Sequence, residues 1–130
     1  TTTTNTQGFY EFTNVADGNY TLQISTTKAW GGLANIDVLR TRQHLAGVQG
    51  TITPLIGVRL LAADVHILGV VNAVDVLQMR RRLAQQTYSW TAPNYVFYPT
   101  SVTVNGANST LNIESLCSGD VDGSFTPPSN

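Results

Sequence analysis

The chain has 130 residues, of which 42% are hydrophobic and 12% are charged, and its formal net charge is −1 at pH 7. This balance excludes strong electrostatic recruitment by nucleic acid or by a membrane surface, and no segment approaches the roughly 20 apolar residues of a membrane span. Cys117 is the single cysteine, which excludes an internal disulfide. Because Thr, Asn, Ser and Gly take places that Lys and Glu usually occupy, we expect a β-rich protein that is secreted or lies at the cell surface.

Residues 1–25 are predicted to form an N-terminal β-hairpin. Apolar and polar side chains alternate over residues 20–25, which is typical of a strand with one buried face, and residues 9–15 form a second β-permissive run. The Asp17-Gly18 pair between the two runs favours a hairpin turn. The motif Gly-Phe-Tyr-Glu-Phe, followed by Gly-Asn-Tyr-Thr-Leu, resembles the hairpin sequence of bacterial Ig-like and carboxypeptidase-regulatory-like sandwiches. The resemblance implies an incomplete Ig-like antiparallel β-sandwich, since those domains have two or three strands before this hairpin.

Two helices, over residues 35–46 and 73–84, are predicted from an internal repeat. With Asp37 superimposed on Asp75, each unit reads Asp-Val-Leu, followed by Arg in the sixth place and Leu in the ninth. The shared residues fall on one face of each helix, and the repeated order indicates two related halves within residues 26–87. The short apolar run 55–62 between the helices is interpreted as an approach to a loop.

Residues 64–75 fit the frame of an EF-hand-type loop that runs directly into the second helix. Such a loop needs oxygen ligands in the first, third, fifth, ninth and twelfth places, a carbonyl in the seventh and Gly in the sixth, where Gly69 stands. The candidate ligands are Asp64, His66, the carbonyl of Val70, Asn72 and Asp75. His66 suits zinc better than a hard cation, Leu68 supplies no ligand, and His66 with Asp64 is too few for zinc. A relic loop that keeps its shape without metal is therefore an open alternative.

A second cation site is hypothesised from two half-loops that lie far apart in the sequence. Gly31, Gly32 and Asp37 fit the back half of the frame, while residues 26–30 cannot supply its front half; near the C-terminus, residues 120–124 fit a front half with no helix behind it. Because Ca²⁺ accepts six to eight oxygens in flexible geometry, the two halves could share one ion. The hypothesised ligands are Asp37, Asp120, Asp122 and Ser124. The alternative is a plain turn at 120–124 and a helix N-cap at Asp37.

The C-terminal third is predicted to return to β-structure. Residues 95–98, 101–104 and 109–116 read as strands, and Asn105-Gly106 favours a type I′ turn between the last two. Residues 88–124 are thus expected to hold the C-terminal strands and the acidic loop, and residues 125–130 a linker or tail. Strands at both ends with helices between them predict the α+β class, here an Ig-like sandwich with an inserted pair of helices.

The helical repeat, the loop 64–75 and the closing Gly-Asp-Val-Asp-Gly-Ser of residues 119–124 resemble the dockerin-type modules in secreted multidomain proteins of Bacteroidetes-like bacteria. The resemblance covers nearly the whole chain, and the helical repeat is its most specific part. It implies a non-catalytic extracellular module that is stabilised by Ca²⁺ and whose helix pair binds a cohesin-like protein.

The sequence favours a structural module and leaves one alternative open. No phosphate loop, nucleophile elbow or zinc-protease motif is present, so we expect no enzyme. An incomplete sandwich leaves an open edge for strand addition, which predicts self-assembly into a filament or adhesin. The alternative is a carbohydrate-binding module, with a stacking platform made of Trp30, Trp90, Tyr95 and Tyr98.

Overall fold

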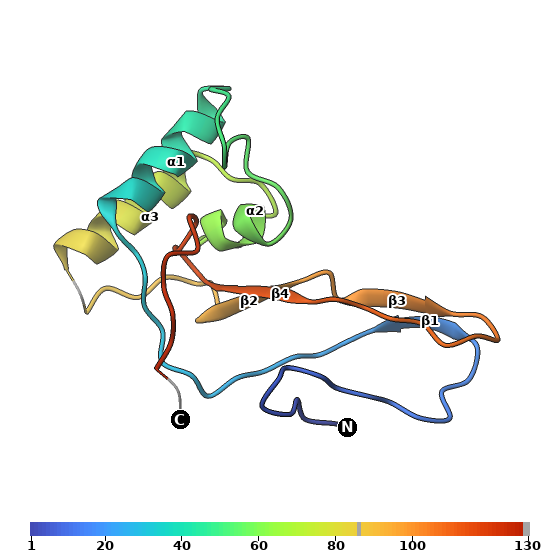
Figure 1. The fold of residues 1–130 in the computed structure, drawn as a ribbon. Helices are drawn as coiled ribbons and strands as arrows, with labels where there is room; N and C mark the ends of the chain where they lie inside the picture. The colour runs from blue at the N-terminus through green and yellow to red at the C-terminus, as the bar shows by residue number, and fades with distance from the viewer. Residues whose placement is uncertain (86, 129–130) are drawn as a thin grey trace. The chain divides into compact units, whose positions relative to one another are not determined.

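The computed structural model describes residues 1–85 and 87–128 and shows a mixed α+β chain (Figure 1). Three helices and two antiparallel sheets of two strands each are found in this part of the chain. In chain order they are β1 (Gly18–Thr21), α1 (Asn35–Leu45), α2 (Gly57–Ala63), α3 (Ala73–Ala84), β2 (Tyr95–Tyr98), β3 (Ser101–Val104) and β4 (Glu114–Cys117). None of the helices in the described ranges is long and apolar enough to cross a membrane.

The chain divides into two compact units. The first joins residues 1–23 to residues 100–111 and contains β1 and β3; the second joins residues 24–99 to the chain from residue 112 onward and contains the remaining elements. The fold class is therefore α+β as predicted, but an Ig-like sandwich is not shown, because the strands described form two separate two-stranded sheets.

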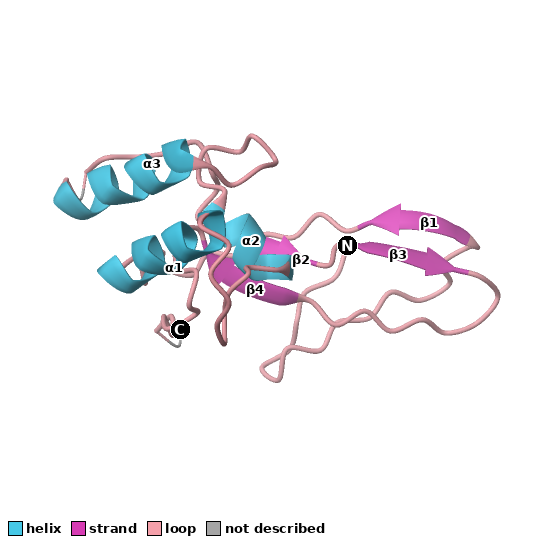
Figure 2. Cartoon of the chain, turned by 90° about the horizontal axis from the view of Figure 1, so that it is seen from above, coloured by secondary structure: helices cyan, strands magenta, loops and turns pink. Residues whose placement is uncertain are grey.

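The two helices predicted from the repeat are confirmed as α1 and α3. They lie side by side and run in opposite directions (Figures 1 and 2). Asp37 and Asp75 occupy the same place, the third residue of each helix, where a carboxylate can accept the N–H groups that a helix start leaves free. The apolar run 55–62 is not only a loop approach, because most of it forms α2, a helix too short for its periodicity to show.

The core of the second unit lies between the helix pair, α2 and the C-terminal segment. Thr41 and Met79, which are related by the repeat, are both fully buried, and the Thr41 hydroxyl lies 3.6 Å from the Met79 sulfur. Val65 and Val121 complete the centre of this core and are also fully buried. Val121 belongs to the C-terminal acidic segment, so that segment is part of the core.

Neither predicted hairpin is formed. β1 pairs antiparallel with β3, with Tyr20 opposite Val102, and β2 pairs with β4. The Asp17-Gly18 and Asn105-Gly106 turns instead contact each other, since the Gly106 N–H donates to the Asp17 carboxylate at 2.6 Å. Alternation identifies a strand and its buried face but carries no information on its partner, so neither turn dipeptide determines which strands pair.

The loop between α1 and α2 is held by a histidine. His44 Nδ1 accepts a hydrogen bond from the backbone N–H of Leu55 at 3.0 Å, and the Leu55 side chain is 2% exposed. To accept this bond, Nδ1 must carry no hydrogen. His44 therefore has a structural role at the end of α1, where it connects the helix to the loop before α2.

Candidate metal centre

Asp37 is the anchor of the candidate centre. Its side chain is fully buried at the start of α1, where Oδ2 accepts the N–H of Ala34 at 2.8 Å. Oδ1 accepts the N–H of Asp122 at 2.9 Å, from a segment 85 residues further along the chain. Asp37 is therefore more than a helix cap, because it also receives the C-terminal acidic segment.

The acidic segment is ordered by its own carboxylates. Asp120, which is 1% exposed, accepts the N–H of Ser124 through Oδ1 at 3.1 Å and the N–H of Phe125 through Oδ2 at 3.2 Å. Asp122 also accepts the Ser124 N–H, at 3.0 Å. The segment thus wraps around its first carboxylate, and Ser124 is exposed.

The structure brings Asp37, Asp120 and Asp122 together into one group that could hold a metal ion. Each offers a carboxylate oxygen, and these oxygens all lie within 4.8 Å of one another. Ca²⁺ binds oxygens at about 2.3–2.6 Å, so two ligands on opposite sides of one ion are separated by about 5 Å. The spacing is compatible with a shared ion, and the donors are hard oxygens only.

The electrostatics of the group favour a cation. Burial raises the pKa of Asp37 to about 6, with Asp122 and Asp120 adding repulsion and the N–H groups of Asp122 and Ala34 acting in the opposite direction. Burial also raises the pKa of Asp120, with a further contribution from Asp122. Loss of hydration and like-charge repulsion therefore penalise the ionised forms of Asp37 and Asp120, and a bound cation would offset that penalty.

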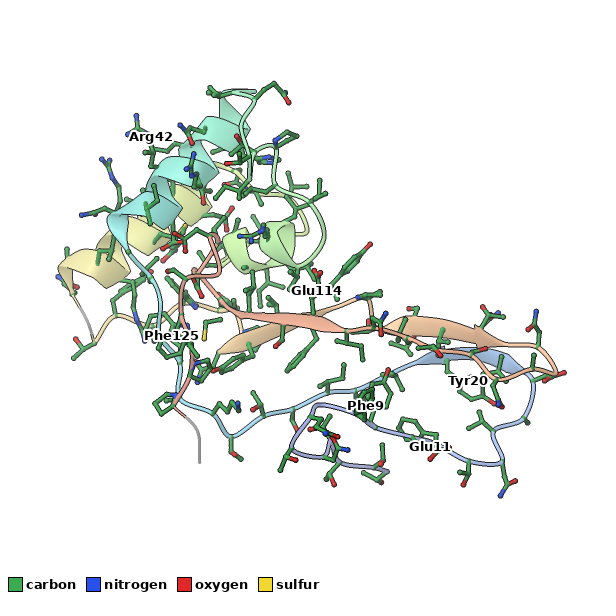
Figure 3. All side chains as sticks on the ribbon, in the orientation of Figure 1. Phe9, Glu11, Tyr20, Arg42, Glu114 and Phe125 are labelled. Carbon is green, nitrogen blue, oxygen red and sulfur yellow. The ribbon has the colours of Figure 1, made fainter. Side chains whose placement is uncertain are left out.

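Two glycines allow the half-loops to meet. Gly32 has φ +93°, and a Cβ there would lie 2.6 Å from Asp120 Cγ. At Gly31 a Cβ would lie 2.5 Å from the Phe125 ring, and Figure 3 shows Phe125 beside the segment that leads into α1. Only glycine permits this approach of the two segments without displacing a carboxylate or the ring.

The contiguous loop 64–75 forms the same hydrogen bonds within one stretch of chain. Asp64 accepts the N–H of Leu68 through Oδ1 at 3.1 Å and that of Gly69 through Oδ2 at 2.8 Å. Asp75 accepts the N–H of His66 through Oδ1 at 2.9 Å and that of Asn72 through Oδ2 at 2.8 Å. The frame read from the sequence is therefore present as a folded loop.

The two loops correspond bond by bond. Asp120 accepts N–H groups four and five residues later, as Asp64 does, and Asp37 accepts from its N-cap residue and from Asp122, as Asp75 does from Asn72 and His66. The split loop thus has the same hydrogen bonds, but its chain is interrupted at the sixth place. Counted from Asp120 as the first place, Phe125 is the sixth residue and ends the front half. Counted back from Asp37 as the twelfth place, Gly31 is the sixth residue and begins the back half.

The remaining candidates of the contiguous loop make structural contacts. Asn72 Oδ1 caps α3 by accepting the Val74 N–H at 2.7 Å, and its Nδ2 donates to the carbonyl of Val70 at 3.3 Å. His66 contributes its backbone N–H to Asp75. Among the residues described, Asp64, His66 and Asp75 do not form a metal-sized group of the kind found at Asp37. Metal binding by this loop stays a prediction.

Two members of the proposed aromatic platform, Trp30 and Trp90, pack against each other and against Arg82. Trp30 and Trp90 pack edge to face with their ring centroids 5.7 Å apart, and the Arg82 guanidinium lies 4.4 Å from the Trp30 ring centroid. The Trp30 indole N–H donates to the carbonyl of Ser118 at 2.9 Å. Both tryptophans are half-buried. Their contacts with the C-terminal segment were not expected from the sequence, since nothing in the pattern around either residue identifies its partner.

Comparison with protein-family models, with curated proteins and with solved structures finds no match to this chain.

Proposed function

We propose that the chain is a non-catalytic, calcium-stabilised extracellular structural module, in which Asp37, Asp120 and Asp122 bind one Ca²⁺. The observation that carries the proposal is the meeting of these three carboxylates, two of them fully buried, within 4.8 Å of one another. Ser124, the fourth ligand predicted from the sequence, lies on the same segment, and two of the carboxylates accept its backbone N–H. The dockerin-like repeat supports the same function, because it predicts a cation at this place in each helical unit.

The donor chemistry favours Ca²⁺ over zinc. The group consists of three carboxylates and contains neither imidazole nor thiolate, which zinc and other borderline metals prefer. Mg²⁺ takes oxygen ligands too, but it demands near-octahedral geometry and loses water reluctantly. The carboxylates of this group already accept several backbone N–H groups, which fixes their positions. Such a group suits the irregular coordination of Ca²⁺ better than the octahedral coordination of Mg²⁺.

Thermal unfolding in the presence of different metals tests this proposal. A ligand that binds only the folded state raises its stability by an amount that grows with the ratio of ligand concentration to Kd. The melting temperature should rise with Ca²⁺, rise less with Mg²⁺ and return to its starting value with chelator. Glu114→Gln, which removes an exposed carboxylate from β4 outside the group, should respond as the wild type does. A melting temperature that is insensitive to Ca²⁺ would refute the proposal.

We further propose that the module assembles by strand addition. β1 and β3 form a two-stranded sheet in which each strand is paired on one side, within the residues described. Such a sheet is marginally stable alone, and an unpaired edge is a template for another strand. Phe9 and Phe12, which are 71% and 45% exposed in the same unit, would be covered by an added strand, completing a sandwich. Light scattering that finds only monomer across a wide concentration range would refute assembly.

The helix pair offers a second protein-binding surface of the kind a cohesin-like partner would use. Leu39 on α1 and Leu77 on α3 are related by the repeat and are 45% and 46% exposed. We rank this surface below strand addition, because single exposed leucines are common on protein surfaces. A carbohydrate-binding function is not favoured, since Arg82 lies over the Trp30 ring.

A further inference from the structure

The segment of residues 118–125 enters the core of the second unit although it lies near the end of the chain. Ser118 and Val121 are fully buried, and the Gly119 N–H donates to the carbonyl of Ala62 in α2 at 2.8 Å. Arg59, also in α2, donates to the carbonyl of Val121 at 2.6 Å. The segment is therefore held by α2 as well as by the start of α1.

Both tryptophans of the protein contact this segment. Trp30 donates its indole N–H to the carbonyl of Ser118 at 2.9 Å. A Cβ on Gly119 would lie 2.6 Å from the outer edge of the Trp90 ring, so the segment passes directly against that indole. The sequence contains two tryptophans in all. Their environment therefore reports whether the segment is docked.

The candidate metal group joins the docked segment to α1. Asp120 and Asp122 lie on the segment, while Asp37 is separated from Asp122 by 85 positions of sequence. Asp37 accepts the N–H groups of Ala34 and Asp122, and one of its carboxylate oxygens lies within 4.8 Å of oxygens of the Asp120 and Asp122 carboxylates. Without a cation the charges of the two half-loops oppose docking, and with one they favour it.

Resting on the calcium site proposed above, we propose that this site is a clasp: the metal decides whether residues 118–125 stay docked, and its removal uncovers Trp30 and Trp90. The contiguous loop 64–75 cannot act in this way, because its two halves are joined by the chain itself. An ion shared by segments so far apart in sequence closes a long loop, so its loss frees a whole segment and not one turn. The helix pair (residues 35–45 and 73–84) lies outside the segment and should keep its structure when the clasp opens.

The test uses the full chain in excess Ca²⁺ and in chelator, with intrinsic tryptophan emission and acrylamide quenching as the first readout. Removing Ca²⁺ should shift the emission to longer wavelength and increase quenching, and added Ca²⁺ should reverse both. Limited chymotrypsin digestion is the second readout, since cleavage after Leu116 and Phe125 should appear in chelator. Far-UV circular dichroism should change little. Asp122→Asn should resemble the chelated protein even in Ca²⁺, while Glu114→Gln, at the exposed residue labelled in Figure 3, should resemble the wild type.

The outcomes separate the clasp from the site on which it rests. If calorimetry shows Ca²⁺ binding but emission and cleavage do not respond, the clasp is overturned and the metal site stands. If calorimetry detects no binding, both fail together. If chelation or Asp122→Asn raises hydrogen exchange throughout α1 and α3, the metal supports the whole unit and the local clasp is overturned. Exchange that rises over residues 118–125 while the helices stay protected supports it.

Discussion

The backbone N–H of Asp122 donates to Oδ1 of Asp37 at 2.9 Å across 85 residues, and the N–H of His66 donates to Oδ1 of Asp75 at the same distance across nine. The same loop structure is thus built once from a continuous chain and once from two distant segments. The interrupted version carries three acidic side chains in one group, whereas the continuous version has His66 and Leu68 where ligands are expected. Loop 64–75 therefore keeps the continuous chain but lacks two of the expected ligands, whereas the split loop is interrupted but keeps the acidic ligands.

Gly32→Ala should destabilise the protein more than a glycine substitution of the same backbone class elsewhere. The new methyl group would need φ +93° and would lie 2.6 Å from Asp120 Cγ, so we expect both backbone strain and displacement of a carboxylate. Gly47→Ala is the matched control, because Gly47 has φ +69° but no atom within 4 Å of the added Cβ. Urea denaturation should give about 1–2 kcal/mol for the control and a larger loss for Gly32→Ala. Equal losses would show that the approach of the two half-loops is not tight.

Metal-free protein should lose stability as the pH rises from about 4 to above 6. The pKa of Asp37 is raised from 3.8 to about 6, so the folded state holds a proton that the unfolded chain releases, and this contribution is complete below pH 3.8 and lost through pH 6. A rise of about two pKa units corresponds to about 3 kcal/mol. Urea unfolding in chelator across this range checks the slope, and Asp37→Asn should remove this contribution. Saturating Ca²⁺ should reverse the trend; a pH-independent difference between the two conditions would argue against binding at Asp37.

His44→Ala should loosen the connection between α1 and α2. It removes the acceptor of the Leu55 N–H and leaves a backbone donor without a partner beside a side chain that is 2% exposed. An unsatisfied buried donor costs about 1–3 kcal/mol, and chemical denaturation should show a loss in this range. Arg42→Ala is the control on the same helix, since Arg42 is exposed (Figure 3), and its effect should stay within about 0.5 kcal/mol.

Met79→Ala should be among the most destabilising substitutions in the helix pair. Met79 is fully buried between the helices, so truncation leaves a cavity and typically costs about 2–5 kcal/mol. Leu77→Ala, two residues earlier on the exposed side of α3, removes a side chain that is 46% exposed and should cost much less. Similar losses at both positions in urea denaturation would contradict the packing described for α1 and α3.

The sequence predicts the helices and the meeting of Asp37 with residues 120–124 because both depend on local or repeated patterns. The repeat placed Asp37 and Asp75 in equivalent positions, and their helices begin two residues before them, as found. Residues 26–30 lack the ligands of a front half-loop and residues 120–124 contain them, which predicts that residues 120–124 lie near Asp37. The structure brings these segments together.

Strand pairing could not be predicted in the same way. Asp17-Gly18 and Asn105-Gly106 are good local hairpin signals, but the structure places them against each other at the ends of β1 and β3. For β1 and β3, the choice of partner depends on contacts between residues 80 to 86 positions apart, which no local pattern contains. The contacts of Trp30 and Trp90 with the C-terminal segment could not be predicted either, because no local pattern identifies their partners.

Calcium titration by isothermal calorimetry on three proteins tests the central claim most directly. Asp120→Asn and Asp64→Asn make the same chemical change at the first place of the split loop and of the contiguous loop. We predict that the wild type binds Ca²⁺, that Asp120→Asn binds one Ca²⁺ fewer per chain and that Asp64→Asn retains the ion lost in Asp120→Asn. An unchanged Ca²⁺ stoichiometry in Asp120→Asn, or no binding by the wild type, would contradict the claim that two distant segments form a calcium site.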